Sequence, residues 1–215
     1  MGKADLIKEL KSLGVLISPK LKRAFKKIDR KDFVLPEFRN VAYENHPLPI
    51  GFGQTISQPF TVAFMLGLLN VRAGDKILEI GAGSGWQTAL LCFLAGKKGR
   101  VMALERIPEL KIFAEKNLNK YCTSLPAEVP RRGTKAGTLM QKDATDGYAQ
   151  EAPFDKIIAA ASARKIPQAW KDQLKTGGRI VAPVKDSIVV LDKISDDKFK
   201  TTIHPGFIFV PLVKG

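Results

Sequence analysis

The residues best suited to chemistry form a glycine-spaced loop between an apolar run and a helical pattern. Gly81, Gly83 and Gly85 follow the apolar run Lys76–Ile80 and lead into the helical pattern Trp86–Ala95. A continuous apolar run is typical of a buried parallel strand. Glycines let the chain turn sharply and let a ligand lie against bare backbone, and the amides at a helix N-terminus attract the polar part of a ligand. The sequence therefore predicts a nucleotide-like cofactor at this loop.

The spacing of the loop indicates the kind of cofactor. It reads G-x-G-x-G, and Trp86 stands where the dinucleotide fingerprint G-x-G-x-x-G has its third glycine. Glu105 ends the next apolar run and is placed to accept hydrogen bonds from ribose hydroxyls. Asp143 follows a third predicted strand, Thr138–Lys142, and can reach the adenine end. This pattern is similar to that of S-adenosylmethionine-dependent methyltransferases. The alternative is an ordinary strand–turn–helix whose glycines serve geometry only.

Strand and helix patterns alternate from Lys76 onward, which predicts a mostly parallel sheet covered on both faces. The predicted strands are Lys76–Ile80, Arg100–Glu105, Thr138–Lys142, Phe154–Ala161, Arg179–Val184 and Ser187–Ile194. The predicted helices are Ala4–Leu13, one capped by Ser18, one opened by Pro59, then Trp86–Ala95, Pro108–Tyr121 and Pro167–Lys175, the last stopped by Gly177-Gly178. The fold class is α/β, a Rossmann-like doubly wound sheet with antiparallel edge strands and a helical N-terminal extension. Val34–Gly53 and Tyr121–Gly137 are predicted loops, and Lys198–Val213 a hairpin-like tail.

One domain accounts for 215 residues. We expect residues 1–70 to supply N-terminal helices and a substrate loop, and residues 71–215 the cofactor-binding core. Two cysteines are too few for a disulfide framework, and no apolar run is long enough to span a membrane. Two histidines without a cysteine cluster give little support for a metal site. We expect a cytoplasmic monomer with no membrane partner and no metal.

The chain is strongly basic, with 35 Lys and Arg against 21 Asp and Glu and a net charge of +14. Such an excess can attract nucleic acid or acidic protein segments. The lysines are spread along the sequence without a long basic block, and no RNA-binding aromatic motif is present. We therefore favour a solvated lysine-rich surface over a nucleic-acid partner.

A second segment, Val41–Pro59, precedes the glycine loop and ends in Thr55-Ile56-Ser57-Gln58-Pro59. This segment resembles the protein-L-isoaspartate O-methyltransferase family, whose most distinctive motif is Thr-Ile-Ser-x-Pro. The resemblance covers most of the chain. Further matches are Arg30–Val34, Leu78–Trp86, Pro153–Asp155, Gln173–Arg179 and Phe209–Leu212. Departures are Asn45 for the family's usual Asp, Trp86 for Tyr, and Lys142-Asp143-Ala144 for Gly-Asp-Gly.

The resemblance implies methylation of the α-carboxylate of L-isoaspartyl residues in damaged proteins or peptides, a step in protein repair. S-adenosyl-L-methionine would be the donor and S-adenosyl-L-homocysteine the product. The substrate-binding residues implied are Thr55, Ile56, Ser57 and Gln58, with Ser57 next to the reacting carboxylate. The predicted cofactor-binding residues are Glu79, Gly81, Gly83, Ser84, Gly85, Glu105, Arg106, Asp143 and Ala144.

The chemistry fits these residue types. A carboxylate with a pKa near 4 is ionised at neutral pH and needs no general base, so the enzyme must orient and desolvate it. The Ser57 hydroxyl can donate one orienting hydrogen bond. The simpler alternative is that Ser57 caps the helix opened by Pro59. A serine hydrolase is disfavoured, because neither Ser57 nor Ser84 lies in a G-x-S-x-G elbow.

Two other functions stay open at this stage. One is a methyltransferase of the same build that acts on RNA or on a dedicated peptide partner, which the positive charge favours. The other is a non-catalytic binding protein that keeps the fold, which the substitutions at Lys142 and Ala144 make conceivable.

Overall fold

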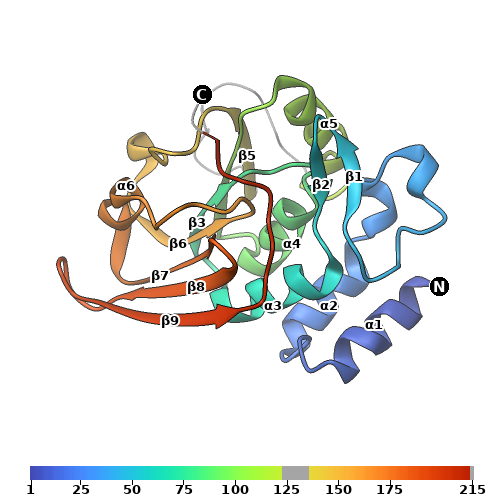
Figure 1. The fold of residues 1–215 in the computed structure, drawn as a ribbon, viewed down its shortest axis with the longest axis horizontal. Helices are drawn as coiled ribbons and strands as arrows, with labels where there is room; N and C mark the ends of the chain where they lie inside the picture. Colours follow the sequence, from blue (N-terminus) through green and yellow to red (C-terminus); the bar gives the residue numbers. More distant parts are fainter. Residues whose placement is uncertain (123–135, 214–215) are drawn as a thin grey trace.

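A seven-stranded sheet forms the centre of the protein, as a computed structural model shows (Figure 1). The structure describes residues 1–122 and 136–213. The strand order is β5-β4-β3-β6-β7-β8-β9. The first five in this order pair in parallel, and β8 and β9 complete the sheet as antiparallel strands. The strands are β3 (Lys76–Ile80), β4 (Arg100–Glu105), β5 (Ala136–Gln141), β6 (Phe154–Ala159), β7 (Leu174–Val184), β8 (Ser187–Lys193) and β9 (Phe199–Pro205). The predicted Rossmann-like α/β fold with antiparallel edge strands is confirmed.

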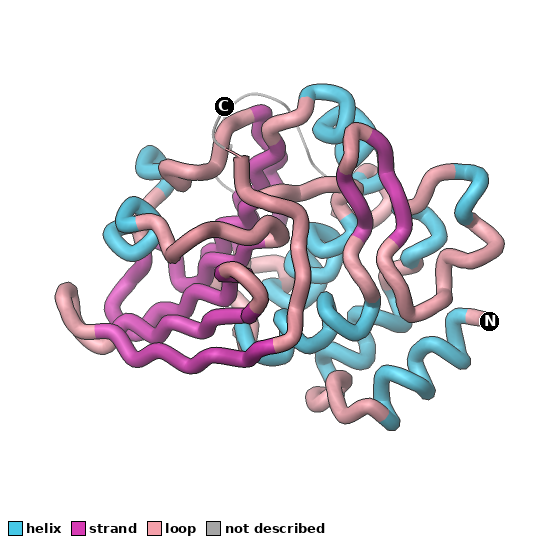
Figure 2. The backbone as a smooth tube through the Cα atoms, in the orientation of Figure 1, coloured by secondary structure: helices cyan, strands magenta, loops and turns pink. Residues whose placement is uncertain are grey.

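Most helical residues gather on one side of this sheet (Figure 2). The helices are α1 (Lys3–Ser12), α2 (Pro19–Lys27), α3 (Pro59–Leu69), α4 (Trp86–Ala95), α5 (Pro108–Leu118) and α6 (Gln168–Asp172), with 3-10 turns η1 (Arg30–Phe33), η2 (Pro36–Phe38) and η3 (Ala149–Glu151). Side chains alternate between the faces along each strand, so Ile77 packs with the cluster under α1–α5 whereas Leu78 packs with Trp170 of α6. Both faces are covered, but among the described residues the second face carries only α6 and η3 beside loops. No helix among the described residues is long and apolar enough to cross a membrane.

The helix and strand boundaries predicted from the sequence are accurate for the central strands β3 and β4 and wrong near the C-terminus. Both β3 and β4 match their predicted limits, and the Ser18 hydroxyl caps α2 by accepting from the Leu21 amide at 3.1 Å. The predicted helix Pro167–Lys175 is wrong at its end, because the chain has already entered β7 at Leu174. Gly177 and Gly178 do not stop a helix. They lie inside β7, where the pairing with β6 shifts register, as in a β-bulge.

Three other expectations need correction. Val34–Gly53 is not all loop, since it contains η2 and β1 (Leu48–Gly51), which forms a hairpin with β2 (Gln54–Ile56). The tail is not a hairpin by itself, because β9 pairs with the preceding β8 and the chain beyond Pro205 holds only an isolated bridge at Pro211. The predicted loop Tyr121–Gly137 lies mostly outside the described residues, and its end belongs to β5.

A buried arginine holds the N-terminal segment against the core. Arg30 is 2% exposed, and its guanidinium donates to the carbonyl oxygens of Ala42 at 2.7 Å and His46 at 3.0 Å. It also donates to the carbonyls of Glu44 at 3.3 Å and Ser57 at 3.2 Å. Burial lowers the pKa of Arg30 to about 9, which is still well above neutral pH, so the group stays charged.

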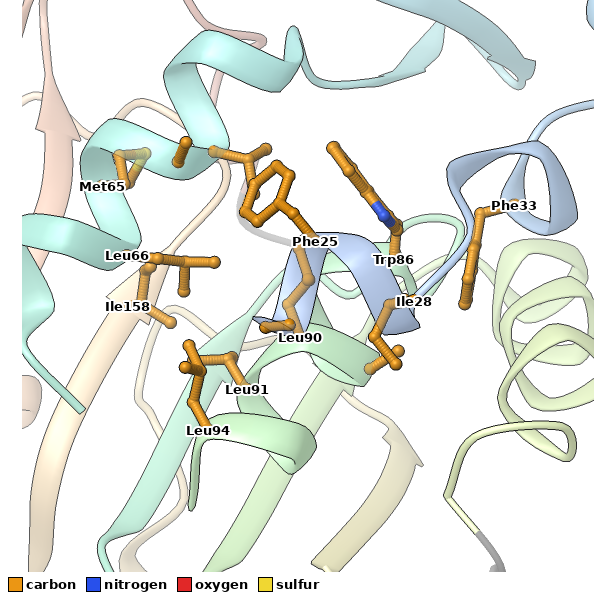
Figure 3. Packing of buried hydrophobic residues seen from close by; sticks show 14 of the residues in the cluster. Phe25, Ile28, Phe33, Met65, Leu66, Trp86, Leu90, Leu91, Leu94 and Ile158 are labelled. Atoms are coloured by element: carbon orange, nitrogen blue, oxygen red, sulfur yellow. The ribbon is translucent and has the colours of Figure 1, made fainter. Parts of the chain in front are cut away.

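The side chain of Trp86, the first residue of α4, packs against the Arg30 guanidinium. The Arg30 guanidinium lies 5.3 Å from the centre of the indole ring, within the range of a cation–π contact. Phe25 of α2 meets the same indole edge-on at 5.6 Å, and Figure 3 shows Trp86 among Phe25, Ile28 and Phe33 of the N-terminal segment. The bulky residue in the third-glycine position therefore joins the N-terminal helices to the cofactor-loop helix.

We expect Arg30→Met to lower the free energy of unfolding by about 2–5 kcal/mol, because it leaves several buried carbonyls without a donor. Arg23→Met is the matched control, since Arg23 is exposed on the same segment and should change stability by no more than about 0.5 kcal/mol. Urea unfolding followed by circular dichroism measures both. Equal losses would show that the carbonyl bonds of Arg30 are not what stabilises this segment.

Candidate active site

A pocket opens at the carboxyl ends of the parallel strands. It encloses about 690 Å³, including open solvent at its mouth. Its walls come from the ends of β3, β4, β5 and β6, from β2 and from the C-terminal segment. The chain order reverses between β3 and β6, and open α/β sheets bind ligands at this kind of switch point. The lining residues are Gln54, Thr55, Ile80, Gly81, Gly83, Leu104, Glu105, Arg106, Ile107, Leu110, Lys142, Asp143, Ala144, Ala160, Ala161, Val210, Pro211, Leu212 and Val213.

Glu105 is held at the pocket wall by two backbone amides. Gly83 donates its amide to Oε2 at 2.8 Å and Ile107 donates to Oε1 at 2.9 Å. A carboxylate oxygen accepts more than one hydrogen bond, so Glu105 can fix the glycine loop and still accept from a pair of vicinal hydroxyls. The structure therefore joins the predicted acidic residue to the predicted loop in one unit.

The glycines of the loop divide into two roles. Gly81 and Gly83 line the pocket with φ angles of +83° and +56°. Gly85 does not line it and instead faces α5, where a Cβ would lie 3.0 Å from Leu118 and 3.3 Å from Ala114. Ser84 is also buried away from the pocket, and its carbonyl accepts from Asn117 of α5 at 3.0 Å. Gly85 and Ser84 thus contact α5, and their predicted contacts with the cofactor stay a prediction.

Glu79 is the clearest departure from the sequence-based assignment. It is fully buried, lies outside the pocket lining and faces α4, where Gln87 donates to it at 3.1 Å and Thr88 at 2.6 Å. Burial raises the pKa of Glu79 to about 8, although the two hydrogen bonds act to lower it. The nearby charge of Glu105 also raises this pKa. Glu79 ties β3 to α4, and its predicted contact with the cofactor stays a prediction.

The far wall of the pocket contains the predicted residues Arg106, Asp143 and Ala144. The Asp143 Oδ1 accepts from the amide and hydroxyl of Thr145 at 2.8 and 2.7 Å. The carbonyl of Ala144 accepts from the indole nitrogen of Trp170 at 3.0 Å. Without its flanking glycines, the turn around Asp143 is therefore fixed by Thr145 and by α6.

The Thr-Ile-Ser-x-Pro segment reaches the pocket at one end. Thr55 lines the pocket, whereas Ile56 is buried, and Ser57 and Gln58 lie outside the lining. The N-cap of α3 is Gln58 and not Ser57, and the Ser57 hydroxyl makes no hydrogen bond within the described residues. The capping explanation of Ser57 is therefore wrong, and its substrate role stays a prediction.

Asn45 supports this segment from outside. Its Oδ1 accepts from the Phe60 amide at 2.9 Å in the first turn of α3, and its Nδ2 donates to Glu9 at 2.8 Å. An aspartate in this position would bring a second carboxylate against Glu9. The departure at position 45 therefore has a local partner in α1.

Sequence reasoning missed the wall formed by residues 210–213. Leu212 donates its amide to the Ser162 carbonyl at 2.8 Å, and the Ser162 amide donates to Val210 at 2.8 Å, which brings the tail beside the end of β6. The motif Phe209–Leu212 does not by itself predict this wall, because its pairing with Ser162 is set by the tertiary structure. Among the described residues, no group of three His, Cys, Asp or Glu side chains could hold a metal ion.

A family model for protein-L-isoaspartate(D-aspartate) O-methyltransferase matches residues 1–215. The chain is a member of this family. It is 41% identical over 212 residues to the protein-L-isoaspartate O-methyltransferase of Methanopyrus kandleri, covering 97% of this chain and 89% of that protein. It is 40% identical over 216 residues to that of Methanothrix thermoacetophila, covering 99% and 95%.

Solved structures of this family share the fold. A protein-L-isoaspartate O-methyltransferase from Plasmodium falciparum, crystallised with S-adenosyl-L-homocysteine, superposes with a TM-score of 0.85 at 23% identity and 98% coverage of both chains. Another protein-L-isoaspartate O-methyltransferase superposes with a TM-score of 0.83 at 24% identity, covering 100% of this chain and 66% of the other. The similarity thus includes the N-terminal helices as well as the sheet.

The close approach at Gly85 predicts a selective effect of a single methyl group. Gly85 and Gly96 flank α4, and both have positive φ angles, but a Cβ at Gly96 meets nothing within 4 Å. Both alanine variants carry the cost of placing a non-glycine residue at a positive φ angle. We therefore expect Gly85→Ala to be less stable than Gly96→Ala by about 1–3 kcal/mol, because only its methyl group overpacks against α5. Urea unfolding of the two variants measures the difference, and equal stabilities would contradict the contact.

The buried Glu79 predicts a pH-dependent change in stability. Its folded-state pKa of about 8 lies above the ordinary value of 4.5, so the folded state keeps a proton that the unfolded chain releases between these values. The contribution of Glu79 to stability therefore falls as pH rises through this window. The gain in unfolding free energy of Glu79→Gln over wild type should grow with pH, at no more than about 1.4 kcal/mol per pH unit.

Urea titrations from pH 5 to 8 measure this difference, in which other titrating groups cancel. Glu37→Gln, at an exposed carboxylate, is the matched control and should differ from wild type by a constant amount. A flat curve for Glu79→Gln as well would show that Glu79 is ionised in the folded protein.

Proposed function

We propose that this protein transfers a methyl group from S-adenosyl-L-methionine to the α-carboxylate of L-isoaspartyl residues in damaged proteins or peptides. One observation carries the proposal beyond family membership. Thr55, from the Thr-Ile-Ser-x-Pro segment, lines the same pocket as Gly81 and Glu105 of the cofactor site. The substrate segment and the cofactor loop thus meet at one place, as transfer between two bound molecules requires.

The pocket residues suit an adenosyl cofactor. Gly81 and Gly83 present bare backbone, and Glu105 offers acceptors for the ribose. Apolar side chains of Ile107, Leu110 and other lining residues provide a surface for a purine base, with Asp143 at its polar edge. The cofactor would supply a methyl group activated by a sulfonium. Gly81, Gly83, Glu105, Arg106, Asp143 and Ala144 are the residues that we propose to hold it.

The chain's own task is to orient the attacking carboxylate and to exclude water from it. An ionised carboxylate needs no base, so orientation and desolvation are the useful contributions. The Ser57 hydroxyl has no hydrogen-bond partner within the described residues. The backbone carbonyl of Ser57 accepts a hydrogen bond from the Arg30 guanidinium at 3.2 Å. We propose that Ser57 donates to the substrate carboxylate while Ile56 and Gln58 support the peptide chain. We further propose that the protein acts as a cytoplasmic monomer.

The test is methyl transfer to an isoaspartyl peptide and to its normal-aspartyl twin. We expect only the isoaspartyl peptide to be methylated, because its free α-carboxylate lies close to the backbone whereas a side-chain carboxylate presents differently. Ser57→Ala should lower turnover at least about tenfold while the affinity for S-adenosyl-L-homocysteine and the melting temperature stay near wild type.

Two controls make the result decisive. Ser195→Ala removes an exposed hydroxyl that donates to Asp197 at 3.0 Å outside the pocket lining, and it should leave turnover unchanged. Bulk RNA serves as the competing substrate. Methylation of both peptides alike, or of RNA in their place, would overturn the repair function, and failure of the folded wild type to bind the cofactor would favour a non-catalytic binding protein.

A further inference from the structure

A groove between α1 and α2 gathers positive charge away from the active site. Its lining consists of five lysines with Ala4 and Ile7, and it includes no acidic residue. The lysines are Lys3, Lys8, Lys11, Lys22 and Lys26. Helices α1 and α2 lie next to the N-terminus in Figure 1. The pocket of the candidate active site lies at the carboxyl ends of the central strands.

Four of the five lysines in this groove make no ion pair within the described residues. Lys3 pairs with Asp29 at 3.6 Å, whereas the other four lysines have no hydrogen bond or ion pair within the described residues. The sequence of α2 contains no acidic residue at all. On α1, Glu9 is engaged with Asn45 and Asp5 with the Gly2 amide. Neither acidic residue lines the groove, which therefore presents four ammonium groups that make no ion pair within the described residues.

Helix spacing makes this arrangement unfavourable by itself. Lys8 and Lys11 are three residues apart on α1, and Lys22 and Lys26 are four apart on α2. Like charges at such spacing destabilise an isolated helix, and here two such pairs face one groove. A polyanion bound along the groove would remove both repulsions.

We propose that this groove binds the phosphate backbone of double-stranded nucleic acid without sequence preference. The lining offers ammonium groups and aliphatic surface only, with no guanidinium fork for bidentate carboxylate recognition and no aromatic ring for base stacking. Such a surface reads charge density, which is highest and most regular along a duplex. The net charge of +14 strengthens attraction at long range. The proposal is independent of the methyl-transfer activity.

The test measures binding of a fluorescein-labelled random-sequence DNA duplex by anisotropy at several salt concentrations. The groove variant combines Lys8→Gln, Lys11→Gln, Lys22→Gln and Lys26→Gln. The control variant removes the same charge at exposed lysines elsewhere, with Lys97→Gln, Lys98→Gln, Lys198→Gln and Lys200→Gln. Melting temperatures confirm that both variants fold.

We expect the groove variant to lose at least about tenfold in affinity at 50 mM salt, and its salt slope to fall by about 3–4 as those phosphate contacts disappear. The control should lose no more than about threefold, from long-range attraction alone. Equal losses in the two variants, or no binding by wild type, would overturn the proposal. So would displacement of the duplex by polyglutamate of equal charge concentration, which would assign the groove to acidic protein segments.

Discussion

The position of the Thr-Ile-Ser-x-Pro segment depends on a buried cation that has no carboxylate partner among the described residues. Arg30 donates to carbonyls spread along residues 42–57 and lies over Trp86 at the start of α4. A guanidinium has five donors in a fixed plane, so these bonds define where the segment passes relative to the glycine loop. Because the same segment continues into β2, Arg30 also determines that Thr55 arrives at the pocket.

Two glutamates at the ends of neighbouring strands have different tasks because they stand at different depths along the same face of the sheet. Glu79 stands one residue before the end of β3, on the face covered by α4, and is used entirely within the fold. Glu105 is the last residue of β4, where the chain leaves the sheet, and meets the amides of the glycine loop at the pocket wall. Glu79 pairs with Ala103, so Glu105 stands two positions further toward the carboxyl end of the sheet, where a carboxylate can reach a ligand.

Departures from the family pattern are matched by local contacts. Asn45 forms hydrogen bonds with Glu9 of α1 and with the first turn of α3. An amide suits this position, because an aspartate there would place its carboxylate against that of Glu9. Trp86 stacks with Arg30 and meets Phe25, so the larger ring fills the contact with the N-terminal helices. At Ala144, Trp170 binds the carbonyl of a turn that has lost its glycines. These substitutions alter the supports of the pocket and leave its glycine loop and Glu105 in place.

The sequence by itself determined the fold class, the limits of β3, α4 and β4, and the family, because these depend on apolar periodicity and on motifs read within a few residues. It also placed Gly81, Gly83, Glu105 and Asp143 at one pocket, since parallel strands end at a common edge. Only the tertiary structure decided that Glu79 and Gly85 serve α4 and α5 and that residues 210–213 close the pocket. It also decided that the lysines of α1 and α2 share one groove. These outcomes depend on which segments distant in sequence pack together, and local spacing carries no information about such contacts.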